Sequence, residues 1–167
     1  MAEENKPSLQ TMVEQTTIAD VYQAAKHLNG VAKKTQLIES PFFFVFCGNE
    51  VYLKPENLQN TGSFKLRGAY NKISQLKPEE QKKGVITASA GNHAQGVAFS
   101  ARKLGVKAVI CMPATTPILK VEATKAMGAE VVLFGDTFDD AYAKSRELQK
   151  QHGYVYIHPF DDIQVLA

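Results

Sequence analysis

The sequence has few of the features that assign a protein class at first sight. Its two cysteines, Cys47 and Cys111, lie far apart in apolar surroundings and form no Cys-x-x-Cys pair. We therefore expect buried, reduced thiols and neither a disulfide nor a metal site. The net charge is only +2 and the basic residues are scattered, so there is no electrostatic case for binding to nucleic acid or to a membrane surface.

Long hydrophobic runs are also missing. The longest, Pro41 to Cys47 (PFFFVFC), is far too short to span a bilayer. The first ten residues, MAEENKPSLQ, are polar and acidic and lack the basic and apolar blocks of a secretory signal. With 167 residues, 44% of them hydrophobic and 22% charged, the composition is that of an ordinary globular domain, and we expect it in the cytoplasm.

The chain then shows a regular alternation of strands and helices. Residues 1–15 are predicted to be a polar tail, Thr16 or Thr17 to cap a helix that ends at Leu28, and Lys33 to Glu50 to be irregular. The expected strands are Glu50–Lys54, Gly84–Ala90, Lys107–Met112, Glu130–Phe134 and Tyr154–Ile157. The expected helices are Ser63–Leu76, Asn92–Leu104, Ile118–Met127 and Thr137–His152. Short strands that alternate with longer helices predict an α/β fold with an open parallel sheet covered by helices on both faces.

One turn between a strand and a helix has the composition of an anion-binding site, and ligands of open α/β sheets gather at such turns. It consists of Ser89, Ala90, Gly91, Asn92 and His93. Backbone N–H groups at a helix start can receive a phosphate or a carboxylate, Gly91 lets the backbone approach the ligand, and Ser89 or Asn92 can cap the helix or contact the ligand. The alternative is structural, because any strand-to-helix turn can use serine, glycine and asparagine.

The loops do not support a nucleotide site. Gly91 and Gly96 are spaced as G-x-x-x-x-G, but no Lys-Ser or Lys-Thr follows them. The dinucleotide fingerprint G-x-G-x-x-G is absent from the whole sequence.

The remaining titratable residues form no recognisable cluster for a metal or for a nucleophile triad. His93 is expected to form a hydrogen bond in the turn and not to act as a general base. His27, His152 and His158 have no identifiable partners, and the pair Asp161-Asp162 is predicted to lie in a loop.

Lys65 lies in an unusual setting, TGSFKLRGAY (Thr61 to Tyr70). If Ser63 caps the predicted helix, Lys65 lies in its first turn, where the positive end of the helix dipole and the nearby Arg67 disfavour the ammonium form. Burial beside Phe64 would act in the same direction. A lysine held partly neutral is a nucleophile for a carbonyl group and gives a Schiff base. The alternative is a lysine whose stem packs over apolar neighbours while its amine reaches water.

The motif around Lys65 and the motif around Ser89 to His93 together resemble a known family. LKPENLQNTGSFKLRGAY, followed by GVITASAGNHAQGVAFSARKLG, strongly resembles the threonine dehydratases (threonine ammonia-lyases). These belong to the fold-type-II, tryptophan-synthase-β-like group of pyridoxal-phosphate enzymes. The similarity continues through MPATTPILKVEATKAMGAEVVLFGDTFDDA to HPFDD and covers roughly residues 20 to 167.

The resemblance implies a role for each matching position. Lys65 would form the Schiff base with pyridoxal 5'-phosphate, Phe64 would pack near this cofactor, and Asn92 would hydrogen-bond its phenolic oxygen. The turn from Ser89 to His93 would hold the substrate carboxylate. The implied reaction converts L-threonine to 2-oxobutanoate and ammonia by removal of the α-proton, β-elimination of hydroxide and hydrolysis of an imine, with Lys65 as the proton carrier.

The resemblance also implies how the chain is divided. Residues 16–54 would be an N-terminal segment of a larger domain, residues 55–158 the smaller α/β domain, and residues 159–167 the start of the return to the larger domain. In this family the chain continues to a glycine-rich loop that grips the cofactor phosphate, and no glycine cluster here could replace it. We therefore expect the N-terminal part of such an enzyme, with an exposed surface where the remainder packs, and a homo-oligomer when full length.

Three alternatives stay open beside a threonine enzyme of isoleucine biosynthesis. Serine dehydratase and serine racemase belong to the same family, and their substrate lacks one methyl group, a difference worth only about 1–3 kcal/mol in binding. A catalytically inactive fragment that only docks into a partner is a second alternative. A nicotinamide-dependent dehydrogenase would rest on the alternating strands and helices alone and lacks its fingerprint.

Overall fold

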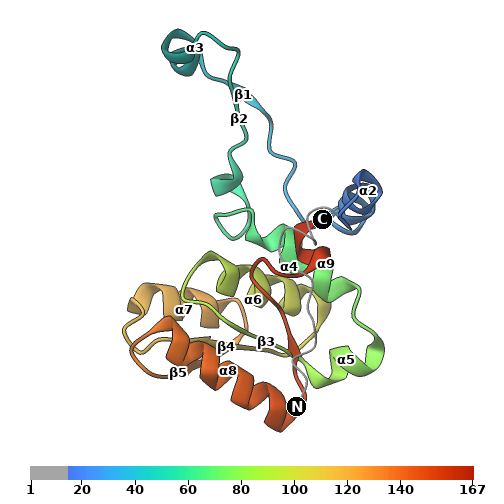
Figure 1. Cartoon of the computed structure of the whole chain (residues 1–167), viewed down its shortest axis with the longest axis vertical. Helices are drawn as coiled ribbons and strands as arrows, with labels where there is room; N and C mark the ends of the chain where they lie inside the picture. The colour runs from blue at the N-terminus through green and yellow to red at the C-terminus, as the bar shows by residue number, and fades with distance from the viewer. Residues whose placement is uncertain (1–14) are drawn as a thin grey trace.

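A four-stranded parallel sheet lies at the centre of the computed structural model, which describes residues 15–167. The strands are ordered β5-β4-β3-β6 and comprise β3 (Val85–Ala88), β4 (Ala108–Met112), β5 (Glu130–Leu133) and β6 (Val155–Tyr156). One face is covered by α4 (Lys65–Ser74), α6 (Asn92–Leu104) and α7 (Ile118–Ala126), and the other by α8 (Phe138–His152) (Figure 1). The predicted open parallel sheet with helices on both faces is confirmed.

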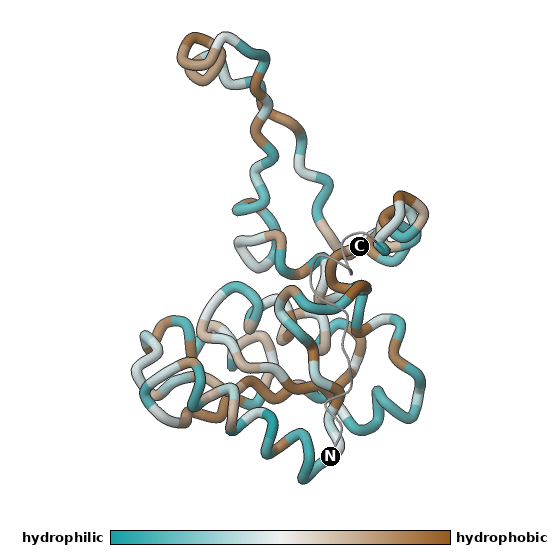
Figure 2. The backbone as a smooth tube through the Cα atoms, viewed as in Figure 1, coloured by the Kyte–Doolittle hydropathy of each residue, from teal (hydrophilic) through white to brown (hydrophobic). Residues whose placement is uncertain are grey.

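The central strands are apolar because both of their faces are buried. In β3, Val85 packs into the core formed with α4 and α6, whereas the next residue, Ile86, packs with Ala141 of α8. Side chains alternate between the two faces along a strand, so a strand covered on both sides has no position for an exposed polar residue. All residues of β3 and β4 are buried, and Figure 2 shows these strands as a hydrophobic band.

The elements before α4 lie outside this sheet. They are α2 (Ile18–His27), β1 (Ile38–Glu39), α3 (Pro41–Cys47), β2 (Tyr52–Leu53) and the 3-10 helix η1 (Glu56–Leu58). β1 and β2 pair antiparallel and form an arm with α3 at its tip (Figure 1). The prediction was wrong here, because residues 33–50 were expected to be irregular and the strand at 50–54 was expected to begin the regular strand–helix alternation. The alternating apolar residues signalled a strand, but they carried no information about its pairing partner.

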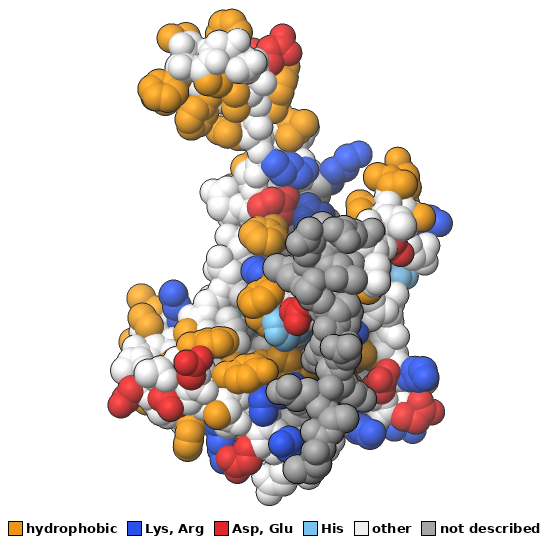
Figure 3. Space-filling model, viewed as in Figure 1, with side chains coloured by type: hydrophobic (Ala, Val, Ile, Leu, Met, Phe, Trp, Pro, Cys, Tyr) orange, Lys and Arg blue, Asp and Glu red, His pale blue; other side chains and the backbone are white. Residues whose placement is uncertain are grey.

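Helix α3, at the tip of the arm, consists entirely of hydrophobic residues. Phe42, Val45 and Phe46 are 73%, 84% and 81% exposed, and no residue of α3 is buried (Figure 3). Cys47 is exposed as well, so the expectation of a buried thiol is wrong for this residue, whereas Cys111 is buried; both are free. An exposed apolar surface is therefore present at residues 41–47.

Local sequence signals predict some of the helix ends correctly but not all of them. Thr17 caps α2 as predicted, since its hydroxyl and the Asp20 carboxylate form a reciprocal capping box. Helix α4 begins at Lys65 after the N-cap residue Phe64, and the hydroxyl of Ser63 is buried without a hydrogen bond. The predicted cap at Ser63 is therefore wrong, but Lys65 still lies in the first turn of the helix.

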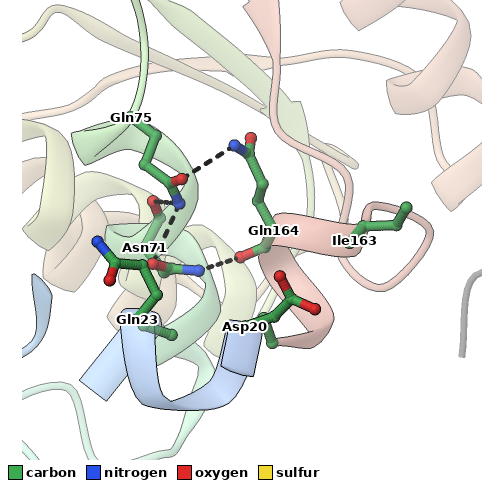
Figure 4. A pocket seen from close by; sticks show the side chains of 8 residues that line it. Asp20, Gln23, Asn71, Gln75, Ile163 and Gln164 are labelled. Carbon is green, nitrogen blue, oxygen red and sulfur yellow. Dashed lines mark hydrogen bonds between the residues drawn. The ribbon is translucent and has the colours of Figure 1, made fainter. Parts of the chain in front are cut away.

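Two short helices complete the fold, α5 (Pro78–Lys83) and α9 (Ile163–Leu166), and α9 joins α2 on α4 through a polar cluster. Asn71, which is 2% exposed, is at its centre (Figure 4). Its side-chain nitrogen donates to the carbonyl oxygen of Gln164 at 2.7 Å, and its oxygen lies 2.8 Å from Nδ1 of His27. Gln75 donates to the same Asn71 oxygen at 3.1 Å. These bonds fix both ends of the described chain on the helix that carries Lys65.

Helices α4 and α6 approach each other closely at Gly96. A Cβ at this position would lie 2.9 Å from the carbonyl carbon of Lys65 and 3.1 Å from the nitrogen of Leu66. Backbone atoms cannot rotate away as the end of a flexible side chain can, so only glycine allows this approach.

Gly96→Ala is expected to destabilise the fold by about 1–2 kcal/mol, because α4 and α6 must separate. Helix propensity alone would favour alanine by about 1 kcal/mol, so a net loss reports the clash. Chemical denaturation monitored by circular dichroism would measure it. Lys103→Ala, at an exposed position of the same helix, is the control and should stay within about 0.5 kcal/mol of the parent. Equal stability of the two variants would contradict the close packing.

Candidate functional site

The amine of Lys65 lies in a cavity at the start of α4. Its Nζ donates to the carbonyl oxygen of Pro159 at 2.8 Å and lies 5.4 Å from the centroid of the Phe64 ring. The cavity has a volume of about 360 Å³ and is lined by Phe64, Lys65, Arg67, Gly68, Pro159, Phe160, Val165, Leu166 and Ala167. The amine thus rests on a backbone acceptor beside an aromatic ring, in a space that a small molecule can enter.

Arg67 contributes less positive charge to this site than its position in the sequence suggests. Its guanidinium forms two hydrogen bonds with the Glu56 carboxylate, at 2.8 and 2.9 Å. These bonds and the opposite charge lower the pKa of Glu56. The charge of Arg67 is therefore paired, so it offers less of the repulsion toward the Lys65 ammonium that the sequence predicted.

The turn that precedes α6 is open and offers free N–H donors. No side chain caps the helix, and Ser89 Oγ accepts from the nitrogen of Gly91 at 3.3 Å. Of the two roles expected for Ser89 and Asn92, capping is therefore excluded, and contact with a ligand stays a prediction. In the described part of the chain, the N–H groups of Asn92, His93 and Ala94 donate to no acceptor. A Cβ at Gly91 would meet no atom within 4 Å. A helix start with unpaired donors and open space in front of it suits an anion.

His93 lies behind this turn and is neutral near pH 7. The residue is 4% exposed, and Nε2 lies 3.1 Å from the carbonyl oxygen of Ile157. Burial lowers the pKa of His93 to about 4, and the nearby charges of Lys65 and His158 act in the same direction. Nδ1 is buried without a hydrogen-bond partner. His93 therefore forms a hydrogen bond as expected, but to the strand end beside the turn and not within the turn.

The segment after β6, residues 157–162, contacts the starts of both helices through Pro159 and Ile157. His158 Nδ1 accepts from the nitrogen of Asp161 at 2.7 Å. Asp162 pairs with Lys72 of α4 at 2.9 Å and accepts from the nitrogen of Gln164 at 2.9 Å, which caps α9. His158 and Asp162 therefore have partners that the sequence did not reveal, since each partner lies either in α4 or in the local turn.

The structure brings together only part of the predicted site within one cavity. Lys65 and Phe64 line it, whereas Ser89, Ala90, Gly91 and Asn92 belong to the neighbouring turn and do not line it. Contact of α4 with α6 at Gly96 and the charge of Lys65 near His93 join the two parts. The sequence missed Pro159, because only the fold brings its carbonyl to a lysine 94 residues away.

Residues 15–167 contain neither a metal-binding cluster nor a helix that could span a membrane. This part of the chain contains no group of three or more His, Cys, Asp or Glu side chains that could hold a metal ion. Its helices are all too short or too polar to span a membrane.

Comparison with known proteins gives consistent matches. The family model described as pyridoxal-phosphate dependent enzyme matches residues 28–167. An L-threonine ammonia-lyase of Thermotoga maritima is 48% identical over 151 residues, which cover 90% of this chain and 38% of that protein.

Two solved structures resemble the fold, each with a TM-score of 0.84. The processed form of threonine deaminase isoform 2 from Solanum lycopersicum is 42% identical, and the match covers 96% of this chain and 43% of that one. Serine racemase from Dictyostelium discoideum is 37% identical, with 90% of this chain and 49% of that one covered. The chain thus spans less than half the length of each of these proteins.

The lowered pKa of His93 predicts a pH-dependent stability. The folded pKa is about 4 against an ordinary 6.5, so the unfolded chain takes up a proton between these values that the folded chain does not. Stability present above pH 6.5 is therefore lost as the pH falls toward 4, by up to about 3 kcal/mol. Urea unfolding at a series of pH values should show this slope, and His93→Gln should flatten it. An identical slope in the variant would assign the pH dependence to other groups.

Proposed function

The chain belongs to the family of pyridoxal-phosphate dependent enzymes, and from this premise we propose that it supplies the lysine and part of the active site of a threonine ammonia-lyase. The proposed reaction converts L-threonine to 2-oxobutanoate and ammonia. One observation carries the proposal: the amine of Lys65 lies in a cavity at a helix start, beside a turn with unpaired N–H donors. The relatives named for threonine support the choice of substrate.

The described residues fit part of the cofactor. Pyridoxal phosphate has an aldehyde, an aromatic ring and a phosphate. Lys65 offers an amine for the aldehyde, and the Phe64 ring, which is 57% exposed, offers an apolar surface for the ring. The sequence contains no glycine cluster for the phosphate, so the chain fits the reactive end of the cofactor better than the phosphate end.

The proposed mechanism divides the work between the cofactor and the protein. When bound, pyridoxal phosphate supplies an electron sink that makes the α-proton of an amino acid acidic. Lys65 would hold the cofactor, and its Nζ, once free, would carry the α-proton. The N–H groups at the start of α6 would bind the substrate carboxylate, and the Asn92 side chain would orient the ring by a hydrogen bond. Over the whole reaction the α-proton and the β-hydroxyl would leave as water, and water added to the resulting free imine would release 2-oxobutanoate and ammonia.

Serine is the competing substrate. Serine racemase is one of the structural relatives, and serine lacks only the methyl group of threonine. A difference of one methyl group changes binding by about 1–3 kcal/mol, so both amino acids are expected to enter the same site with different efficiency. A chain that only docks into a partner, without turnover, is the second candidate, and the fully exposed apolar helix α3 favours it.

We also propose a division of the chain into two parts. Residues 55–158 would form the smaller α/β domain, and residues 16–54 would belong to a larger one together with residues 159–167. The proposal is supported by the separation of α2 and the arm from the parallel sheet (Figure 1) and by the position of α9 against α2.

The proposed function predicts selective labelling of Lys65. The purified chain would be mixed with pyridoxal phosphate, reduced with borohydride and digested, and the adducts located by peptide mass. We expect one dominant adduct at Lys65, because its amine is partly buried at a helix start whereas surface lysines are solvated. Lys65→Arg should remove this adduct, and Lys103→Arg, at an exposed position, should leave it unchanged. Labelling spread over many lysines would contradict a preorganised site.

Measuring turnover of L-threonine and of L-serine shows which of the two is the preferred substrate. With cofactor and L-threonine, formation of 2-oxobutanoate above the rate of the Lys65→Arg variant is expected, and it should exceed formation of pyruvate from L-serine by about tenfold. A higher rate with serine would reassign the substrate. Selective labelling of Lys65 without turnover of either amino acid would favour the docking alternative.

A further inference from the structure

One short stretch of backbone is hydrogen-bonded to side chains from the starts of both helices in the candidate site. The carbonyl oxygen of Pro159 accepts from Lys65 Nζ at 2.8 Å, and the carbonyl oxygen of Ile157 lies 3.1 Å from His93 Nε2. Only His158 separates the two acceptors. The position of the Lys65 amine and the position of the His93 ring are therefore coupled through three consecutive residues, which we call the crossing stretch.

We propose that His93 is a positioning residue that orients the crossing stretch and thereby fixes the carbonyl group on which the Lys65 amine rests. This proposal rests on the proposed function, since it assigns a task in the site built around Lys65. It departs from the direct contact with substrate expected for His93 from the sequence, because the ring is 4% exposed and directed at Ile157.

The hydrogen bond to Ile157 explains why an imidazole is buried here. A buried polar group without a partner costs about 1–3 kcal/mol, and Nδ1 of His93 has none in the described part of the chain. The bond at Nε2 is the polar interaction that offsets this cost. A carbonyl oxygen only accepts, so Nε2 must carry the proton and the ring must be the Nε2–H tautomer.

Other contacts hold the residues on either side of the peptide between Ile157 and His158. The nitrogen of Ile157 donates to Ile86 of β3 at 2.9 Å, which holds the preceding peptide. On the far side, His158 Nδ1 and the pair formed by Asp162 with Lys72 fix the residues after Pro159. The hydrogen bond from His93 holds the carbonyl side of the peptide plane that joins Ile157 to His158. Rotation of that plane would move the Pro159 carbonyl and the amine that it holds.

Two substitutions show whether the His93 side chain positions the backbone through its hydrogen bond or only fills space. The side-chain nitrogen of glutamine reaches about as far from the backbone as Nε2 of histidine, whereas that of asparagine reaches only as far as Nδ1. His93→Gln therefore keeps a donor for Ile157, and His93→Asn loses it. Neither variant titrates near neutral pH, so charge does not differ between them.

The first measurement is the rate at which pyridoxal phosphate and borohydride label Lys65 in the folded variants. His93→Gln should label within about twofold of the parent, and His93→Asn about tenfold more slowly, because a misplaced amine reacts poorly. Hydrogen exchange of the amides of residues 158 and 160–162 should rise in His93→Asn only. Labelling at the parental rate in His93→Asn, or an equal loss in both variants, would overturn the proposal, since filling of space alone treats the two alike.

A second measurement uses the unaltered chain, so it tests the role of His93 even if the variants fail to fold. Nitrogen-15 NMR of labelled histidine identifies the tautomer, and the proposal requires Nε2–H at His93; an Nδ1–H tautomer would refute it. If the unaltered chain gains no adduct at Lys65, the proposed function fails, yet hydrogen exchange and the tautomer still test the role of His93. The two failures are therefore distinguishable.

Discussion

The site depends on the contact between α4 and α6 at Gly96. At this point the backbone of Lys65 and Leu66 lies where any larger residue would place its Cβ, so the starts of the two helices are held side by side. One start carries the lysine and the other carries the turn with free N–H donors. If the helices separated, the Lys65 amine and the free N–H donors of the turn would lie too far apart to contact the same small molecule.

Helix α4 is also held from the opposite side. Gly68 allows a close approach of Val165 in α9, and the Asn71 cluster ties α2 and α9 to the same helix. The helix that bears Lys65 is thus fixed against the sheet core on one side and against both ends of the described chain on the other. Buried polar groups with several hydrogen bonds, such as Asn71, fix one arrangement more strictly than apolar contacts do. The arm lacks such contacts and leaves α3 exposed.

Electrostatics in the site favour neutral and paired groups. Arg67 is matched by Glu56, and Lys72 by Asp162, so two cations near the lysine are offset by carboxylates. His93 is kept neutral by burial. The unpaired groups that remain are N–H donors at the start of α6 and the amine of Lys65, whose present partner is a carbonyl oxygen. Under the proposed function, the N–H donors would suit the carboxylate of the substrate and the amine would suit the aldehyde of the cofactor.

The amino-acid sequence alone determined the elements of the parallel sheet and the motifs of the site. The helix from Asn92 to Leu104 and the strands that flank it follow from apolar periodicity and from glycine at the helix end, which act over a few residues. The motif around Lys65 identified the family for the same reason, since its residues are contiguous.

Tertiary structure decided the pairing of β1 with β2, the partner of Lys65 and the partner of His93. The two site contacts join residues 94 and 64 positions apart, and both acceptors are backbone carbonyl groups, which every residue possesses. No residue type marks such an acceptor in the sequence. Only the packing of α4 and α6 across the end of β6 selects Pro159 and Ile157, because hydrogen bonds form between groups that the fold has already brought within reach.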